Sequence, residues 1–231
     1  MQDFIKAGMI NSKMLVTYPE PDASSLYRHY HRLVVVDHHG CRRTYTIAEF
    51  ERLTGMRYLS HLEFTSKAVY HEVAEQCQRC IVNKTVSQKA ISVGVSYADQ
   101  IYKGFVNAVE IRWIDANIGY GLFAAKECAP GEFVGEYVGC VRKVPCIFGG
   151  VNEYFYRYPL YRTGFFVYAI DASSQCNEVS FINHGKENAN CEAVVGVARG
   201  LFHVCIRTIR PVHKGEEFLF DYGSSAATTD A

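Results

Sequence analysis

Two kinds of spaced residues in this 231-residue chain could do chemistry. The first is Cys77-x-x-Cys80, a thiol pair with the spacing of metal and redox sites. Zinc needs four ligands, however, and no second cysteine or histidine pair lies nearby at finger-like spacing. His38, His39 and Cys41 could also bind a metal, but they flank an expected turn. We therefore interpret the two spaced cysteines as buried thiols and expect no metal.

The second pattern is the glycine pair in Ile118-Gly119-Tyr120-Gly121-Leu122, which follows a strand-like run over Val109 to Ile114. Glycines at such a place let the backbone approach a neighbouring group closely. Because most loops with this pattern are only turns, the pair by itself indicates little about function.

Three further segments place the glycine pair in a more specific context. They are Gly135-Glu136-Tyr137-Val138-Gly139, then Phe181-Ile182-Asn183-His184 with Asn190-Cys191, and last Gly215-Glu216-Glu217-Phe218-Leu219-Phe220-Asp221-Tyr222-Gly223. In order and spacing the four segments resemble the SET domain of protein lysine methyltransferases, from about Val109 to Gly223. The resemblance is closest to small bacterial SET proteins of the chlamydial type, which share the Asn152-Glu153-Tyr154 run and a helical N-terminal extension.

This resemblance implies an S-adenosylmethionine-dependent protein lysine N-methyltransferase whose substrate is a histone or histone-like protein. Tyr222 is then the principal catalytic tyrosine, pointing its hydroxyl at the amine and the transferring methyl group. Tyr137 and Tyr154 match positions of the lysine channel, where aromatic rings can hold a methylammonium by cation-π attraction. Phe220 matches the position that limits the product, and a phenylalanine there implies di- or trimethylation.

The resemblance also assigns the cosubstrate site. The backbone of Gly119, Tyr120 and Gly121 would wrap the methionine part of S-adenosylmethionine. Asn183 would bond its amino or carboxylate end, and His184 would present main-chain groups to the adenine. Taken singly, each of these residues is more often core or turn than ligand. Glu216-Glu217 is interpreted as a solvated turn before the last strand.

Two departures from the family pattern bear on function. Ser180 stands where the family commonly has arginine, and the tail after Gly223 lacks the three cysteines with which many relatives close the substrate channel. Either another segment closes the channel, such as a neighbouring subunit or the N-terminal helices, or the chain is truncated. Two alternatives remain open: a catalytically inactive peptide-binding module, and a methyltransferase for a non-histone protein or a polyamine.

The elements that must position these residues differ between the two halves. Residues 1–105 are expected to form a helical N-terminal module with a small β-hairpin. Its first helix begins at the capping box Thr46-x-x-Glu49, a second box at Ser60-x-x-Glu63 begins a longer helix with an apolar stripe, and a third covers Val86 to Tyr102. That stripe must be covered by the other half or by a second copy, so a homodimer is expected.

Residues 106–223 are expected to form the SET domain, and residues 224–231 a flexible tail. Thirteen of the 18 glycines fall from Gly119 onward, as in short strands joined by tight turns. The fold class is therefore α+β: a helical module followed by short, mostly antiparallel sheets. The resemblance adds a knot-like C-terminal crossing that includes Asn190.

Composition limits the partners. The 24 basic and 24 acidic residues give no net charge, which argues against strong direct nucleic-acid binding. The back half is slightly acidic, so it could attract a lysine-rich protein tail. No apolar run is long enough to span a membrane, and no signal peptide is evident. We expect a cytoplasmic protein with free thiols; the resemblance alone adds secretion into a host cell and a nuclear location.

Overall fold

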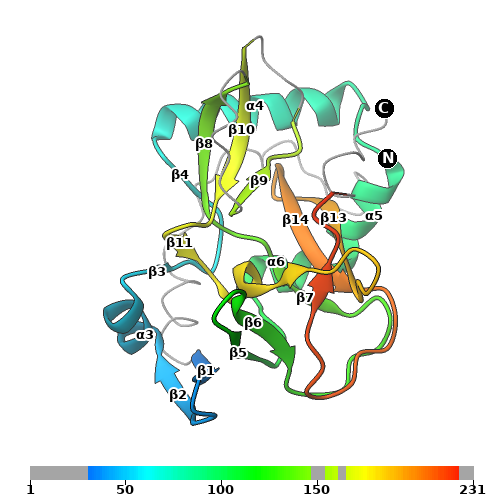
Figure 1. The fold of residues 1–231 in the computed structure, drawn as a ribbon. Coiled ribbons are helices and arrows are strands. Elements are labelled where there is room, and N and C mark those ends of the chain that lie inside the picture. Colours follow the sequence, from blue (N-terminus) through cyan, green and yellow to red (C-terminus); the bar gives the residue numbers. More distant parts are fainter. Residues whose placement is uncertain (1–30, 147–153, 161–164, 224–231) are drawn as a thin grey trace.

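The fold was analysed in a computed structural model, in which residues 31–146, 154–160 and 165–223 are described (Figure 1). The expected tail, 224–231, and the Asn152-Glu153 pair lie outside these ranges. The helices are α3 (Ile47–Thr54), α4 (Lys67–Val82), α5 (Gln88–Ser96), α6 (Ala98–Lys103) and the 3-10 turn η2 (Glu178–Phe181). Within the described ranges, no helix is both long and apolar enough to cross a membrane.

The strands are short and form four small sheets. They are β1 (Arg32–Val36), β2 (Arg42–Thr46), β3 (Arg57–Tyr58), β4 (Glu63–Phe64), β5 (Val109–Asp115), β6 (Gly119–Ala124), β7 (Phe133–Glu136), β8 (Cys140–Pro145), β9 (Phe155–Arg157), β10 (Phe166–Asp171), β11 (Gln175–Cys176), β12 (Asn183–His184), β13 (Cys191–Ala198), β14 (Leu201–Thr208) and β15 (Leu219–Phe220). The sheet orders are β2-β1-β5-β6, β4-β8-β10-β9, β11-β3 and β12-β15-β13-β14-β7. The expected α+β class of small, mostly antiparallel sheets is confirmed.

The first helix begins where the sequence predicts. Thr46 accepts a hydrogen bond from the backbone N–H of Glu49, and the Glu49 carboxylate accepts from the backbone N–H of Thr46. Gly55 ends α3 with φ of 71°, a left-handed conformation that glycine adopts at low cost.

The second predicted helix start, at Ser60, is wrong. Glu63 lies in β4, which pairs in parallel with β8, and its carboxylate accepts two hydrogen bonds from Arg57. The helix α4 begins instead at Lys67, where the Ser66 side chain accepts from the backbone N–H of Val69. A capping pattern is a local signal, and here a strand pairing with a distant segment overrides it.

The third predicted helix is divided at Tyr97 into α5 and α6. The Tyr97 hydroxyl donates to the carbonyl of Gly131, and its ring lies 5.0 Å from that of Phe133. Gly94 lies inside α5 because that helix packs directly on β13. A β-carbon there would collide with the backbone carbonyl of Val197.

The back half covers the apolar stripe of α4. Tyr70, Val73 and Cys77 are buried, and α4 packs on β14 and β8 (Figure 1). Burial raises the pKa of Cys77 to about 12, as expected for an inert core thiol. Cys80 is only half-buried. The stripe therefore gives no reason for a homodimer, which stays a prediction without structural support.

Strand pairing interleaves the two halves. In parallel, β1 pairs with β5, β3 with β11 and β4 with β8. At the other end, β15 lies between β12 and β13 and runs parallel to both. The side chain of Asn190 holds the segment that leads into β15. It accepts a hydrogen bond from the backbone N–H of Leu219 and donates one to the carbonyl of Glu217. The domain boundary near residue 105 and the knot stay predictions.

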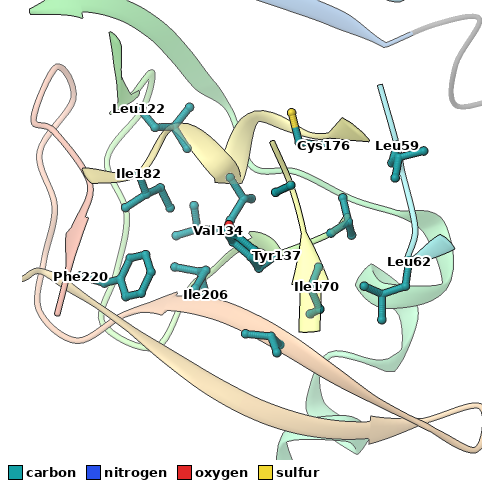
Figure 2. Packing of buried hydrophobic residues seen from close by; sticks show 14 of the residues in the cluster. Leu59, Leu62, Leu122, Val134, Tyr137, Ile170, Cys176, Ile182, Ile206 and Phe220 are labelled. Atoms are coloured by element: carbon teal, nitrogen blue, oxygen red, sulfur yellow. The ribbon is translucent and has the colours of Figure 1, made fainter. Parts of the chain in front are cut away.

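The larger of the two apolar core clusters in the described ranges includes two of the predicted site residues, Tyr137 and Phe220. Figure 2 shows Tyr137, Val134, Ile182, Ile206 and Phe220 gathered within it. Packing at this density holds aromatic rings in fixed orientations, so the core itself positions side chains for the site.

Candidate functional site

One part of the site is built around Tyr222. Its hydroxyl donates to the carbonyl of Ile182 at 2.7 Å, and its backbone N–H donates to His184 Nδ1 at 3.1 Å. Its ring centroid lies 4.7 Å from that of Phe220 and 5.3 Å from that of His184. Phe220 is 4% exposed and Tyr222 is 39% exposed. The tyrosine therefore lies where the core meets the surface, and its hydroxyl has a fixed direction.

A second part is the buried phenol of Tyr137. Its hydroxyl donates to the carbonyl of Tyr154 at 2.9 Å, and its ring lies 5.6 Å from that of Tyr156. Burial raises the pKa of Tyr137 far above its usual range, and the nearby Tyr222 hydroxyl raises it further. Tyr137 therefore stays a neutral hydrogen-bond donor. Tyr154 is 41% exposed and marks the outer side of this group.

The third part joins the glycine strand to Asn183. The side-chain amide of Asn183 donates to the carbonyl of Tyr120 at 3.3 Å and to Glu217 Oε1 at 2.9 Å. A β-carbon on Gly121 would lie 2.5 Å from that carboxylate oxygen, so any larger residue at this position must displace the Glu217 side chain. At Gly119, with φ of 81°, a β-carbon would meet nothing within 4 Å. One glycine allows tight packing, and the other leaves open space.

The interpretation of Glu216-Glu217 as a solvated turn is wrong. Glu217 holds Asn183, while Glu216 accepts from Asn190 at 3.1 Å and pairs with Arg210 at 2.7 Å. Partial burial would raise the pKa of Glu216, but these partners and the backbone N–H of a neighbour lower it overall. The signal was available in principle, because two amide side chains in adjoining motifs need acceptors when they are buried.

Two groups of the site were missed. Tyr156 follows Tyr154 by two residues, so the alternation of a strand could have placed both on one face. The carbonyl of Ile182 is a main-chain group and has no signal in the residue types. With these additions, the structure packs Phe220 and His184 against Tyr222, and Tyr137 against Tyr156. It also joins Asn183 to the glycine strand.

The chemistry of this arrangement is that of orientation and shielding. It offers two phenols, a side-chain amide, backbone groups of a glycine strand and the carboxylates of Glu217 and Asp221. In the part of the chain that the structure describes, no group of three or more histidine, cysteine, aspartate or glutamate residues could hold a metal ion. Such a set can bind a polar, cationic small molecule beside aromatic rings.

Residues 119–223 match the family model described as SET domain. N-lysine methyltransferase KMT5A-A of Danio rerio is 27% identical over 141 residues, which are 56% of this chain and 39% of that protein. Histone-lysine N-methyltransferase set-2 of Caenorhabditis elegans is 31% identical over 113 residues, 45% of this chain and 7% of that protein. The chain therefore matches less than half the length of each of these relatives.

Among solved structures, one of ATXR5 in complex with histone H3.1 mono-methylated on R26 superposes with a TM-score of 0.56. It is 16% identical, and the match covers 77% of this chain and 86% of that chain. Together with the family match, this superposition shows that the chain has the SET-domain fold, with mixed, mostly antiparallel small sheets and some helices.

Proposed function

We propose that this protein transfers methyl groups from S-adenosylmethionine to the side-chain amine of lysine in a protein substrate. The observation that carries the proposal is the convergence of three motifs. Tyr137, Ile182 and Phe220 come from segments far apart in the chain and share one core cluster, and Tyr222 donates to Ile182, next to Asn183, within the region that matches the SET domain. Relatives named as lysine methyltransferases support it.

The residues present fit such a donor. S-adenosylmethionine carries an ammonium, a carboxylate and a positive sulfur, so it needs a polar, partly acidic site. The Asn183 amide beside the Glu217 carboxylate suits the amino-acid end, and Gly119 leaves open space next to the backbone. His184 is accessible at the rim. We assign Gly119, Tyr120, Gly121, Asn183 and His184 to hold the donor.

When bound, the donor supplies an electrophilic methyl group on a positively charged sulfur. The chain itself must orient the lysine amine and let it lose its proton. The Tyr222 hydroxyl donates to the carbonyl of Ile182, which fixes its direction, and a hydroxyl oxygen is also the kind of acceptor that can orient an N–H of the amine. Tyr137 stays protonated and is no base. Burial among aromatic rings lowers the pKa of lysine from about 10.4, so its proton can leave to water.

For the product we propose di- or trimethyl-lysine. The Phe220 ring is buried against Tyr222 and has no hydroxyl with which to hold a water molecule in the channel. Such a water can be displaced by methyl groups. Mass spectrometry of the product should show di- or trimethylation, and Phe220→Tyr should shift it toward monomethylation. Monomethyl-lysine alone from both proteins would contradict this assignment.

A labelled-methyl assay tests the proposed activity on histones, a histone-like bacterial protein, a polyamine and the protein itself. Tyr222→Phe should lower turnover by about 100-fold, since orienting the reacting groups can contribute that much. Tyr102→Phe is the matched control, because Tyr102 is similarly exposed but lies on α6 and contacts Arg199. Unchanged activity in Tyr222→Phe would overturn the catalytic assignment. Failure to bind donor in calorimetry would favour the inactive peptide-binding module.

Finer proposals concern substrate, location and relatives. A histone or histone-like substrate is supported by the net acidic back half and by relatives named for histone lysines.

Kinship with chlamydial-type SET proteins rests on the motif run alone. This kinship also implies secretion into a host cell and its nucleus, whereas a cytoplasmic location is proposed from the free-thiol composition. Fractionation of an infected culture would test both. A homodimer would be tested by sedimentation over a range of concentrations.

A further inference from the structure

A buried carboxylate in η2 is held from the other half of the chain. Glu178 is 2% exposed. The Tyr58 hydroxyl donates to its Oε2 at 2.8 Å, and the His31 ring nitrogen contacts its Oε1. In sequence, Tyr58 is 120 residues from Glu178 and His31 is 147 residues from it. A charge at this depth is costly unless such partners satisfy it.

Backbone bonds hold the same segment. The N–H of Arg57 donates to the carbonyl of Ser174, and the N–H of Leu59 donates to the carbonyl of Cys176, each at 2.8 Å. These bonds belong to the parallel pair of β3 and β11. The front half therefore contacts this segment in two ways. Main-chain hydrogen bonds hold β11, which precedes η2, and side chains hold Glu178.

Only one turn of chain separates Glu178 from the reacting groups. The backbone N–H of Ile182 donates to the carbonyl of Val179 at 3.1 Å, which closes η2. The carbonyl of Ile182 then accepts the Tyr222 hydroxyl. Asn183, next in the chain, holds Tyr120 and Glu217. A movement of Glu178 would therefore also displace the carbonyl of Ile182, which orients the Tyr222 hydroxyl.

We propose that Glu178 is a positioning residue for methyl transfer, and that Tyr58 and His31 act through it to fix the Tyr222 hydroxyl. This inference rests on the proposed function. Stability alone gives no reason for a carboxylate here, because well-packed apolar residues in place of a buried polar pair are often neutral or stabilising. The carboxylate instead fixes the orientation of η2, because Tyr58 contacts one of its oxygens and His31 contacts the other.

The decisive variant replaces both buried partners by apolar residues, Tyr58→Phe with Glu178→Leu. We expect its thermal midpoint to stay at or above that of the wild type while kcat falls about 10-fold or more, with a smaller change in the KM for the donor. The matched control is Tyr168→Phe. This tyrosine is also buried and donates to a carboxylate, that of Glu72, but it lies on β10. Its kcat should stay within about twofold.

Hydrogen exchange separates this inference from the proposed function. In the protein without donor, backbone amides of residues 182–184 should exchange faster in Tyr58→Phe than in the wild type or Tyr168→Phe. An inactive wild type would refute the proposed function. The exchange rates of residues 182–184 would still test whether Tyr58 and Glu178 hold this segment in place. A well-folded double variant with wild-type kcat, or equal exchange in Tyr58→Phe and Tyr168→Phe, would overturn the inference. If the double variant does not fold, the comparison of single variants decides.

Discussion

Replacing Gly121 with alanine should separate Glu217 from Asn183. The added β-carbon would lie 2.5 Å from Glu217 Oε1, 2.7 Å from Ile114 Cδ1 and 3.1 Å from Asn183 Nδ2. All three atoms end side chains, so they can move while the backbone stays in place. The carboxylate is nearest and must move most, which breaks its 2.9 Å hydrogen bond with the amide.

The expected cost follows from these contacts. A hydrogen bond to a charged group contributes about 1.5 to 3 kcal/mol, and overpacking costs about 1 to 3 kcal/mol. Because Glu217 is only half-buried and water can replace its partner, we expect about 2 kcal/mol in total for Gly121→Ala. This corresponds to about a 30-fold change in the unfolding equilibrium, readily measured by urea denaturation.

A double-mutant cycle isolates the contact. In a Glu217→Ala background the carboxylate is gone, so the penalty of Gly121→Ala should fall below about 1 kcal/mol. Gly119→Ala is the control on the same strand: it adds backbone strain of about 1 kcal/mol at positive φ but meets no atom within 4 Å. Its cost should be the same in both backgrounds. Equal costs of Gly121→Ala in both backgrounds, within about 0.5 kcal/mol, would refute the reasoning.

Three other substitutions probe the frame around the site. Gly94→Ala should destabilise the protein by more than about 3 kcal/mol in thermal unfolding, because its β-carbon collides with the Val197 backbone; a smaller loss would mean that α5 can shift from β13. Thr46→Ala should cost about 1 kcal/mol by losing the cap of α3, with no change in donor affinity by calorimetry. Burial lowers the pKa of His203, but the Glu136 carboxylate 2.7 Å away raises it more, so the net shift is upward. Its stabilising contribution is therefore full below the ordinary pKa of about 6.5 and is lost as pH rises through the raised value. The stability difference between wild type and His203→Gln should shrink as the pH rises above about 6.5, and a constant difference would contradict the assignment.

The sequence was most informative where the signal is a dense motif. Tyr222, Phe220 and Asn183 lie in segments that carry several distinctive residues each, and the structure brings those segments together. Thr46 shows the same for local structure, since a capping box needs only residues three apart. The functional roles of the site residues stay proposals, but which segments meet at the site was foreseeable from these motifs.

The misses have a common physical cause. The β3, β4 and β11 strands are two residues long, so no periodicity can reveal them, and each exists only because a distant segment pairs with it. The same holds for Glu217, whose partner Asn183 lies 34 residues away. Local patterns describe which secondary structure a segment prefers, whereas these contacts depend on the tertiary fold, which brings distant segments together.

The parallel pairing of β12 with β15 also sets the order in which the protein can assemble. It joins residues 183–184 to residues 219–220 across the β13–β14 hairpin, and closing this loop costs chain entropy. Pairings of this kind slow folding relative to helices and hairpins. A refolding chain should therefore regain most of its helix signal early and its ability to bind a small molecule at Asn183 only in the slowest phase.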